Sequence, residues 1–515
     1  MQKPEQPVLQ DIVLIGGGHS HVGVLRQFAM NPLPGVRLTL ICRDTDTPYS
    51  GMLPGYIAGH YSHDDVHIDL SRLAEFAGAR FYRDEATGLD AASQRVMCRD
   101  RPPVSYDLLS INIGSSPRTA EVKGAAEHAV PVKPISQFNR RWRGLLDRIQ
   151  QHRGPFTLAV VGAGAGGVEM ALAMQYRLQN ELRTCANRSV DLHVHLLDAA
   201  ATILPTHSAK VRAVFERTLA ERGVNVHLGA AVTEVTARTL QIKGEKSPLI
   251  ADEVLWITRA GGPQWLAQAG LALDDGLFIR VRDTLQVEND DRIFAVGDIA
   301  NMIHHPREKA GVFAVRQGKP LADNLRRMAL GKTLLNYHPQ KKWLALISTG
   351  DRYAVASRGK LNVSGALVWR WKDQIDRRFM RKFKELPAMP NNQFKPDTGA
   401  ARSAKDAAQA LSLATMRCGG CGAKVGSTVL SRALSKLQPV NREDVLVGLH
   451  APDDAAVLRV PPGKAIVQTV DFFRAFIDDP YLFGQIAANH SLGDIFAMGA
   501  MPQSATAIAT VPYGI

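Results

Sequence analysis

The most telling stretch of the sequence is Asp11-Ile12-Val13-Leu14-Ile15-Gly16-Gly17-Gly18, a short apolar run that ends in three glycines. A helical pattern follows from His21 to Met30, and a second apolar run extends from Val36 to Cys42. The order strand, glycine loop, helix, strand predicts a parallel β-sheet with a crossover helix. Glycines at such a turn let the backbone approach a pyrophosphate, whose negative charge the helix N-terminus stabilises.

The same pattern returns further along the chain, with a strand over residues 156–161, a helix from Val168 to about Leu182 and a strand over residues 192–197. Its loop carries Gly162, Gly164 and Gly167 at the spacing that dinucleotide-binding loops use. Asp198 ends the second of these strands, where a carboxylate can accept a hydrogen bond from a ribose 2′-hydroxyl and disfavours a 2′-phosphate. This second strand–loop–helix–strand pattern therefore predicts that the chain binds NADH rather than NADPH. The alternative for Asp198 is a solvated charge at a strand end.

The first glycine loop departs from the pattern. Gly16 and Gly18 occupy the first two glycine positions, but His21 stands at the third. The strand end that usually supplies a ribose-binding acid reads Cys42-Arg43-Asp44, which leaves Asp44 as the candidate.

Two further segments extend the pattern: the strand-like run 106–115, which ends in Gly114-Ser115, and the run 291–298, which ends in Gly297-Asp298. With them, residues 9–330 resemble the pyridine nucleotide oxidoreductases, flavoproteins with two dinucleotide-binding domains. The resemblance implies that Asp298 binds the ribitol of FAD. It also implies contacts to FAD from Gly16, Gly18, Gly114 and Gly297, and contacts to NADH from Gly162, Gly164, Gly167 and Asp198.

Within this family the chain looks most like the type II NADH dehydrogenases. The disulfide reductases need a Cys-x-x-Cys pair beside the flavin, and none precedes residue 418. Residues 48–55 and 314–319 match the character of the NADH dehydrogenase group, in which the second stretch lies near the flavin ring and the acceptor. For Gln317-Gly318, a contact to the acceptor and simple packing of a helix on the flavin remain equally open.

A basic and aromatic stretch follows at residues 369–383, with apolar side chains at helical spacing. It reads either as an interfacial membrane helix or as a helix packed on its own domain with a solvated basic face. Asp373 and Asp376 dilute the charge and favour the second interpretation.

The sequence changes character near residue 416, after a segment rich in Pro, Asn, Lys, Ala and Ser. Cys418 and Cys421 have the spacing of metal ligands, but no second pair or His cluster completes a tetrahedral site. A thiol activated by the cation of Lys424 and an inert loop cysteine are the alternatives. Several aspartates follow, of the kind that hold Mg²⁺ on a triphosphate.

Four motifs, at residues 421–424, 453–457, 469–473 and 493–499, together resemble the start of selenide, water dikinase. This resemblance implies that Cys421 and Lys424 are catalytic, that Asp454 and Asp494 bind Mg²⁺, and that Asp471 and Asp494 face ATP. His490 stands where some members carry Asn. We expect the ATP site to be incomplete, because the later segments of that family are not present by Ile515.

The predicted fold class is α/β, with two Rossmann-like domains for FAD and NAD(P)H, then an incomplete α+β domain of the AIR synthase type. We place the FAD domain at 1–125 and 285–330, the NAD(P)H domain at 126–284, a C-terminal flavoprotein region at 331–386, a linker at 387–415, and the synthetase part at 416–515.

Composition limits the partners and the compartment. Lys and Arg exceed Asp and Glu by 62 − 49 = 13, which fits solubility and anionic ligands, and no basic–aromatic motif for nucleic acid is evident. Five dispersed cysteines, no signal peptide and no apolar run of about 20 residues favour the cytoplasm. We expect small-molecule substrates (NAD(P)H, an electron acceptor, selenide and ATP), no nucleic acid and a homodimer.

The resulting hypothesis is an FAD-dependent NAD(P)H oxidoreductase fused to selenide, water dikinase, which makes selenophosphate, AMP and phosphate from selenide, ATP and water. Two alternatives stay open. One is a peripheral NADH:quinone oxidoreductase with a vestigial tail, and the other is a flavin domain that senses redox state and regulates selenophosphate synthesis.

Overall fold

The computed structural model describes residues 8–184, 191–258, 260–359 and 361–387, and in the C-terminal part 430, 433–435, 437, 440–449, 455–472 and 474–508. The chain divides into two compact units. Gln10–Phe394 form the larger unit, and Lys395–Ile515 together with Met1–Leu9 form the smaller one.

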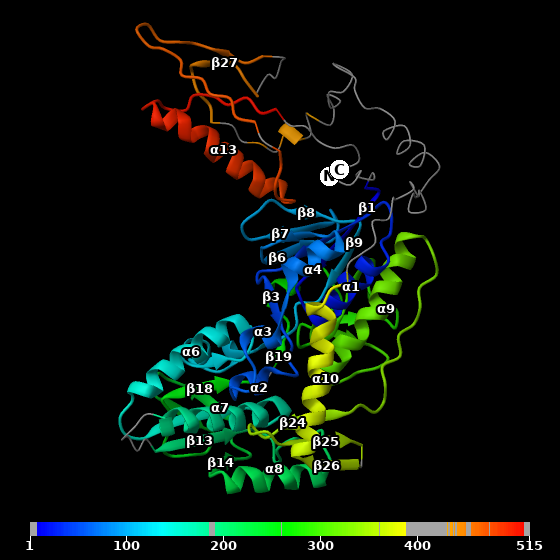
Figure 1. Cartoon of the computed structure of the whole chain (residues 1–515), viewed down its shortest axis with the longest axis vertical. Coiled ribbons are helices and arrows are strands. Elements are labelled where there is room, and N and C mark those ends of the chain that lie inside the picture. Colours follow the sequence, from blue (N-terminus) through cyan, green and yellow to red (C-terminus); the bar gives the residue numbers. More distant parts are fainter. Residues whose placement is uncertain are drawn as a thin grey trace. The chain divides into compact units, whose positions relative to one another are not determined.

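An eight-stranded sheet is the centre of the larger unit (Figure 1), with the order β23-β20-β21-β22-β9-β1-β2-β5. Its strands are β1 (Gln10–Ile15), β2 (Val36–Ile41), β5 (Arg80–Tyr82), β9 (Leu108–Ile111), β20 (Ile279–Val281), β21 (Gln286–Val287), β22 (Asp290–Ala295) and β23 (Ala300–Met302). β1 pairs in parallel with both β2 and β9, and β22 adds in parallel to β9. Parallel strands buried on both faces read as continuous apolar runs, as β1 does.

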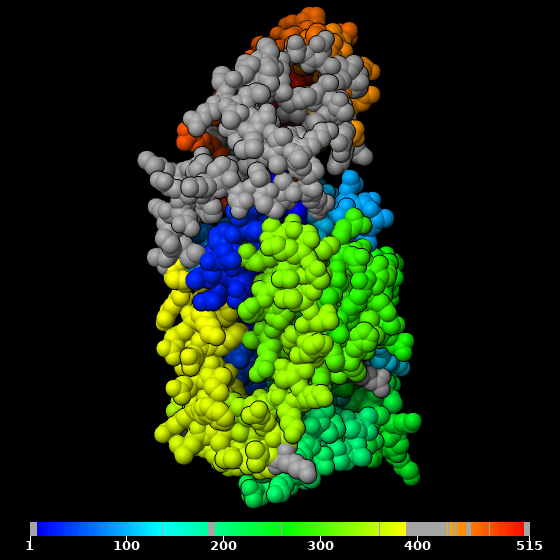
Figure 2. All heavy atoms as spheres, turned by 90° about the vertical axis from the view of Figure 1, so that its right-hand side faces the viewer, coloured from blue at the N-terminus to red at the C-terminus, as the bar shows by residue number. Residues whose placement is uncertain are grey.

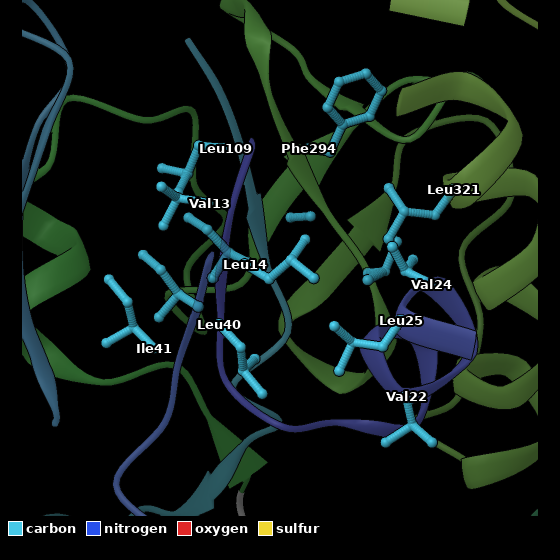
Figure 3. Packing of buried hydrophobic residues seen from close by; sticks show 14 of the residues in the cluster. Val13, Leu14, Val22, Val24, Leu25, Leu40, Ile41, Leu109, Phe294 and Leu321 are labelled. Atoms are coloured by element: carbon cyan, nitrogen blue, oxygen red, sulfur yellow. The ribbon is translucent and has the colours of Figure 1, made fainter. Parts of the chain in front are cut away.

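The core of this sheet lies between the strands and two helices, α1 (His19–Met30) and α9 (Gly311–Ala329). Figure 3 shows Val24 and Leu25 of α1 and Leu321 of α9 beside Leu14 of β1 and Phe294 of β22. All five side chains are fully buried. This packing fixes the N-terminus of α1 at the carboxyl end of β1, where the first glycine loop lies.

A second, five-stranded sheet has the order β11-β18-β12-β13-β14. Its strands are β11 (Val130–Pro131), β12 (Phe156–Val161), β13 (Leu192–Leu197), β14 (Val224–His227) and β18 (Glu253–Trp256), and its helices are α6 (Ile135–Gln151), α7 (Ala165–Thr184) and α8 (Ala209–Glu221). The predicted strands at 156–161 and 192–197 match the observed ones. α7 begins three residues before the predicted start, at Ala165.

Smaller elements complete the unit. They are β3 (Asp46–Pro48), α2 (Leu53–Ile57), α3 (His63–Val66), β4 (His67–Asp69), α4 (Leu70–Ala77), β6 (Ala86–Asp90), β7 (Arg95–Cys98), β8 (Val104–Ser105), β10 (Ser116–Pro117), η1 (Thr119–Glu121), α5 (Ala125–His128), β15 (Val232–Val235), β16 (Thr239–Ile242), β17 (Leu249–Ile250), β19 (Ala260–Gly261), η2 (Gln264–Gln268) and η3 (Gly297–Ile299).

A three-stranded antiparallel sheet, β24 (Ala345–Ser348), β25 (Ala354–Arg358) and β26 (Leu361–Gly365), leads into the last helix of the larger unit, α10 (Ala366–Lys384). In Figure 2, blue N-terminal residues are visible between the yellow α10 and the lime-green α9.

In the smaller unit the described elements are β27 (Val445–Val447), β28 (Val457–Leu458) and α13 (Pro480–Ala497). None of the residues of α13 is buried, and Phe472, Phe476 and Phe496 are exposed. The predicted linker from residue 388 onward lies outside the described residues.

Candidate functional site

The flavin-side glycines converge on Asn112, which follows β9. A Cβ added to Gly16 would lie 2.5 Å from the Asn112 carbonyl oxygen, and a Cβ on Gly18 or Gly297 would lie 2.4 or 2.5 Å from its Oδ1. Only glycine fits at these three positions. Gly114 has φ +70° and no atom within 4 Å of an added Cβ, so the backbone there faces open space.

Asn112 was missed as a site residue in the sequence, although it stands in the predicted strand end 106–115. Its Nδ2 is buried and has no hydrogen-bond partner, and neither has the buried Nε2 of His19 at the start of α1. Buried polar atoms are normally paired. Two orphaned nitrogens beside glycines that leave room for a ligand fit a polar cofactor such as a dinucleotide.

His21, which stands at the third glycine position, is buried and hydrogen-bonded on both ring nitrogens. Its Nδ1 lies 2.7 Å from the Gly16 carbonyl oxygen, which can only accept, so Nδ1 carries the proton. Its Nε2 therefore accepts from the Ser110 hydroxyl, 2.8 Å away. Burial lowers the pKa of His21 to about 4, so the ring is neutral and braces the loop against β9. Further along α1, Gly23 allows a close approach to Gly318 of α9.

Asp298 lies in η3, directly after β22. Its Oδ2 accepts from the Lys133 ammonium at 2.8 Å. Burial lowers the pKa of His19 to about 4, and the opposing charges of Asp298 and Lys133 act on the same ring. The Gly297 N–H donates to Gln317 Oε1 at 2.7 Å, and Gln317 is buried. Gln317 thus holds the turn before Asp298.

A cavity adjoins this turn. Its lining includes Asp298, Lys309, Phe313, Gln317 and His305. Burial lowers the pKa of Lys309, and the charge of Asp298 opposes that shift.

The second glycine loop is built differently. A Cβ on Gly167 would lie 1.7 Å from the Gly162 carbonyl oxygen, whereas Gly164 has no atom within 4 Å. Asp198 Oδ2 accepts from the Ala163 N–H at 2.5 Å, and its Oδ1 accepts from the Ala200 N–H at 2.8 Å. The carboxylate is therefore anchored against the loop rather than being a free strand-end charge.

A polar cluster joins three distant segments beside these loops. The Lys372 ammonium of α10 donates to Asp376 Oδ2 at 2.7 Å and to the Gly51 carbonyl at 2.5 Å. The Tyr49 hydroxyl also bonds to Asp376, and its ring stacks on Phe379 at 4.5 Å. These contacts hold the turn at residues 49–51 on α10.

Glu169, the fifth residue of α7, completes this cluster. Its Oε1 accepts from the Ser348 N–H at 2.7 Å. Burial raises the pKa of the carboxyl from 4.5 to about 6, against the opposing effect of the Lys372 charge. One signal for Glu169 was present in the sequence, namely its position two residues after Gly167.

Asp44 pairs with Arg43 at 2.9 Å on the half-exposed end of β2. Burial raises the pKa of the Cys42 thiol and raises that of Cys98 to about 12, so neither thiol is readily ionised at neutral pH.

Comparison with known proteins now decides the family. Residues 10–318 match the sequence profile of the pyridine nucleotide-disulphide oxidoreductases. The chain belongs to this family. It therefore carries an NAD(P)H/FAD oxidoreductase domain, and FAD and NADH are the cofactors typical of the family.

Relatives of this oxidoreductase part include the NADH dehydrogenase-like protein YutJ of Bacillus subtilis, 25% identical over 71% of this chain and 99% of that protein. The fold is also that of the sulfide:quinone oxidoreductase of Aquifex aeolicus, with a TM-score of 0.61 and 17% identity over 74% of this chain and 93% of the other. The NDH2 of Plasmodium falciparum, solved in complex with NADH, has a TM-score of 0.60 and 14% identity over 75% of this chain and all of the other.

Residues 452–514 match the N-terminal domain of AIR synthase related proteins. Selenide, water dikinase of Clostridioides difficile is 50% identical over 95 residues, which are 18% of this chain and 27% of that enzyme. The chain thus carries a partial selenide, water dikinase region and spans about a quarter of the curated dikinases it matches.

In this dikinase region the structure brings two predicted residues to neighbouring positions. The Thr469 hydroxyl donates to Asp494 Oδ2 of α13 at 2.9 Å. One turn earlier on the same helix, His490 Nε2 lies 3.9 Å from Asp471 Oδ1. Asp471 and Asp494 thus lie along one side of α13, with His490 between them in the sequence. Cys421, Lys424 and Asp454 lie outside the described residues.

The oxidoreductase helix α10 packs on its own domain, with Val368, Lys372, Asp376, Met380 and Phe383 buried. Its outer face carries exposed basic side chains such as Arg370, Arg378 and Arg381, and an apolar stripe lies among them. Leu367, Trp371 and Ile375 recur at intervals of four and are 77%, 47% and 39% exposed. Among the described residues, no helix is long and apolar enough to cross a bilayer.

Proposed function

We propose that residues 10–386 are an FAD-dependent NADH:acceptor oxidoreductase. The observation that carries this is the pair of glycine loops in one unit, each beside a backbone turn that faces open space: Gly114, which follows β9 next to the first loop, and Gly164 within the second loop. FAD, when bound, would accept a hydride from NADH and pass electrons to a second substrate.

The chain's own residues would bind and orient these groups. Asn112 Nδ2 and Asp298, with Gly16, Gly18, Gly114 and Gly297, would hold FAD, and Asp44 would lie near its adenosine end. Gly162, Gly164, Gly167 and Asp198 would hold NADH. Lys133 would hold the Asp298 carboxylate in place, since the two side chains are 2.8 Å apart. The raised pKa of Glu169, about 6, would let this carboxyl group exchange a proton near pH 6, while it would be mostly ionised at pH 7.

Flavin reduction by NADH and by NADPH tests this proposal. The purified chain should release FAD on denaturation and be reduced faster by NADH. Asp198→Ala should narrow that preference, because the acceptor for the 2′-hydroxyl is lost. A well-folded protein that cannot take up FAD would refute the proposal, and faster reduction by NADPH would refute the assignment of Asp198.

The exposed stripe Leu367, Trp371 and Ile375 favours a second candidate, a quinone reductase at a membrane surface. Apolar side chains on one face of a helix with Arg and Lys nearby suit the interface of an anionic bilayer. Flotation with anionic vesicles tests it. Binding should be lost in the triple serine variant of these residues, and equal flotation of both proteins would exclude this role for the stripe.

For the dikinase region we propose the roles that the resemblance implies. Cys421 and Lys424 are the catalytic pair, Asp454 and Asp494 hold Mg²⁺, and Asp471 faces ATP. Activity would need the remaining part of a dikinase fold. A homodimer in the cytoplasm stays a prediction that light scattering and cell fractionation can test.

A further inference from the structure

A cluster of metal-ligating side chains lies apart from the glycine loops, and one of its members, His305, also lines the cavity described above. Asp283, His305 and His338 each offer a ligand atom, and these atoms lie within 4.8 Å of one another. The residues come from three separate segments, so their meeting is a product of the fold.

The topology of the large sheet brings two of these segments together. β20 and β23 are parallel neighbours, with Val281 opposite Met302. The Ile303 N–H continues the pairing by donating to the Val281 carbonyl at 3.0 Å. Asp283 and His305 follow these two strands, so both side chains extend from the same end of the sheet.

The third segment is fixed by hydrogen bonds. The Tyr337 N–H donates to the Asp283 carbonyl at 2.8 Å. Asn324, fully buried on α9, donates to the carbonyls of Thr284 and Leu335 and accepts from the Leu335 N–H. These bonds bind the Asp283 and His338 loops to one another before any ligand arrives, which lowers the entropic cost of binding.

The ligand atoms have distances close to those of a metal centre. His338 Nδ1 and His305 Nε2 are 3.2 Å apart, and His305 Nε2 is 3.8 Å from Asp283 Oδ1. Two nitrogens on one tetrahedral zinc stand about 3.4 Å apart, since each Zn–N bond is about 2.1 Å long. The two imidazole rings are at 89° to each other, so their in-plane lone pairs can converge on one ion.

A second triad, Asp46, His63 and His67, fails this test. Its two rings are stacked 3.7 Å apart and nearly parallel, at 10°. Lone pairs in parallel planes do not meet at one ion.

We propose that Asp283, His305 and His338 bind a divalent transition metal ion of the zinc type, with water completing the coordination. Two imidazoles and one carboxylate are a donor set that suits Zn²⁺ rather than Mg²⁺ or Ca²⁺. His304, whose Nδ1 lies 3.4 Å from Asp283 Oδ1, is exposed and is a neighbour of the carboxylate rather than a required ligand.

Zn²⁺ titration of the flavin-loaded full chain tests this site. All proteins would carry Cys418→Ser and Cys421→Ser, so that these thiols cannot bind the ion. We expect one strong site, weakened at least about 100-fold by His305→Ala or His338→Ala and about tenfold by Asp283→Asn. Co²⁺ in place of Zn²⁺ should give the visible absorption of a tetrahedral site.

Two matched control variants test whether the loss of Zn²⁺ binding is specific to the proposed ligands. His304→Ala should weaken Zn²⁺ binding by less than about tenfold, and the double variant His63→Ala with His67→Ala should leave it unchanged. Flavin content and melting temperature show that each variant is folded. Absence of a strong site, its persistence in the His305→Ala, His338→Ala double variant, or its loss with His63 and His67 would each overturn the proposal.

Discussion

At the scale of single residues, Asn112 and His21 explain why the first glycine loop works without its third glycine. Asn112 lies so close to Gly16, Gly18 and Gly297 that none of them tolerates a Cβ. His21 joins the loop to β9 through Gly16 and Ser110. The loop is therefore held by buried polar contacts that the glycine spacing alone does not reveal.

His21→Ala should lower the free energy of unfolding by about 2–4 kcal/mol, because it leaves a cavity and removes the partners of Gly16 and Ser110. His21→Gly, which restores the family pattern, should be no more stable. Chemical denaturation with FAD bound measures both. His193→Ala, on an exposed ion pair, is the control and should change little. A His21→Gly protein as stable as the parent would contradict the bracing role.

Glu169 gives a pH-dependent prediction. Because its pKa is raised from 4.5 to about 6, it stabilises the fold fully below about pH 4.5 and loses that contribution as the pH rises through 6. Glu169→Gln stays neutral, so its stability relative to the parent should rise by about 2 kcal/mol between pH 4.5 and pH 8. Urea unfolding at both pH values tests this. The exposed Glu216→Gln should show no such trend, and a difference independent of pH for Glu169→Gln would refute the assigned pKa.

At the scale of elements, the strands and glycine loops could be predicted from the sequence, whereas the polar contacts between distant elements could not. β12 and β13 were found at their observed bounds because buried parallel strands are continuous apolar runs bounded by turn residues. Lys133 and Asp298 are 165 residues apart, and Lys372 and Gly51 are 321 apart. No local pattern marks such pairs, because they depend on how the finished sheets and α10 pack.

Two glycines of the segment between β12 and α7 and the first turn of α7 have different expected roles, Gly167 in stability and Gly164 in nucleotide binding. Gly167→Ala forces a methyl group onto the Gly162 carbonyl, a backbone atom that cannot move aside cheaply, so stability should fall by about 1–3 kcal/mol together with NADH affinity. Gly164→Ala meets no protein atom and should impair only the KM for NADH. Melting temperature and steady-state kinetics measure the two effects. Unchanged kinetics in Gly164→Ala would argue against contact between this loop and the nucleotide.

At the scale of the whole molecule, the described parts of the two units differ in how far their apolar side chains are buried. The oxidoreductase unit has continuous apolar cores around both of its sheets. In the described part of the smaller unit, α13 has no buried residue, and large apolar side chains such as Phe472 and Met501 are exposed. Exposed apolar surface of this kind is usually covered by further chain or by a partner.

A polypeptide limited to residues 1–515 should therefore reduce its flavin with NADH but make no selenophosphate. Thr469, Asp471, His490 and Asp494 are exposed or half-exposed around α13, whereas phosphoryl transfer needs ligands held in place on several sides of the triphosphate. Phosphorus NMR of a reaction with selenide, ATP and Mg²⁺ measures the product, and flavin absorbance in the same sample confirms that the oxidoreductase is active. Supplying the remaining dikinase sequence on the same chain should restore the product, and Lys424→Ala in that longer protein should remove it while flavin reduction continues. Selenophosphate from residues 1–515 alone would show that this region already holds ATP in a productive geometry, and its persistence after Lys424→Ala would show that this lysine is not part of the phosphoryl-transfer site.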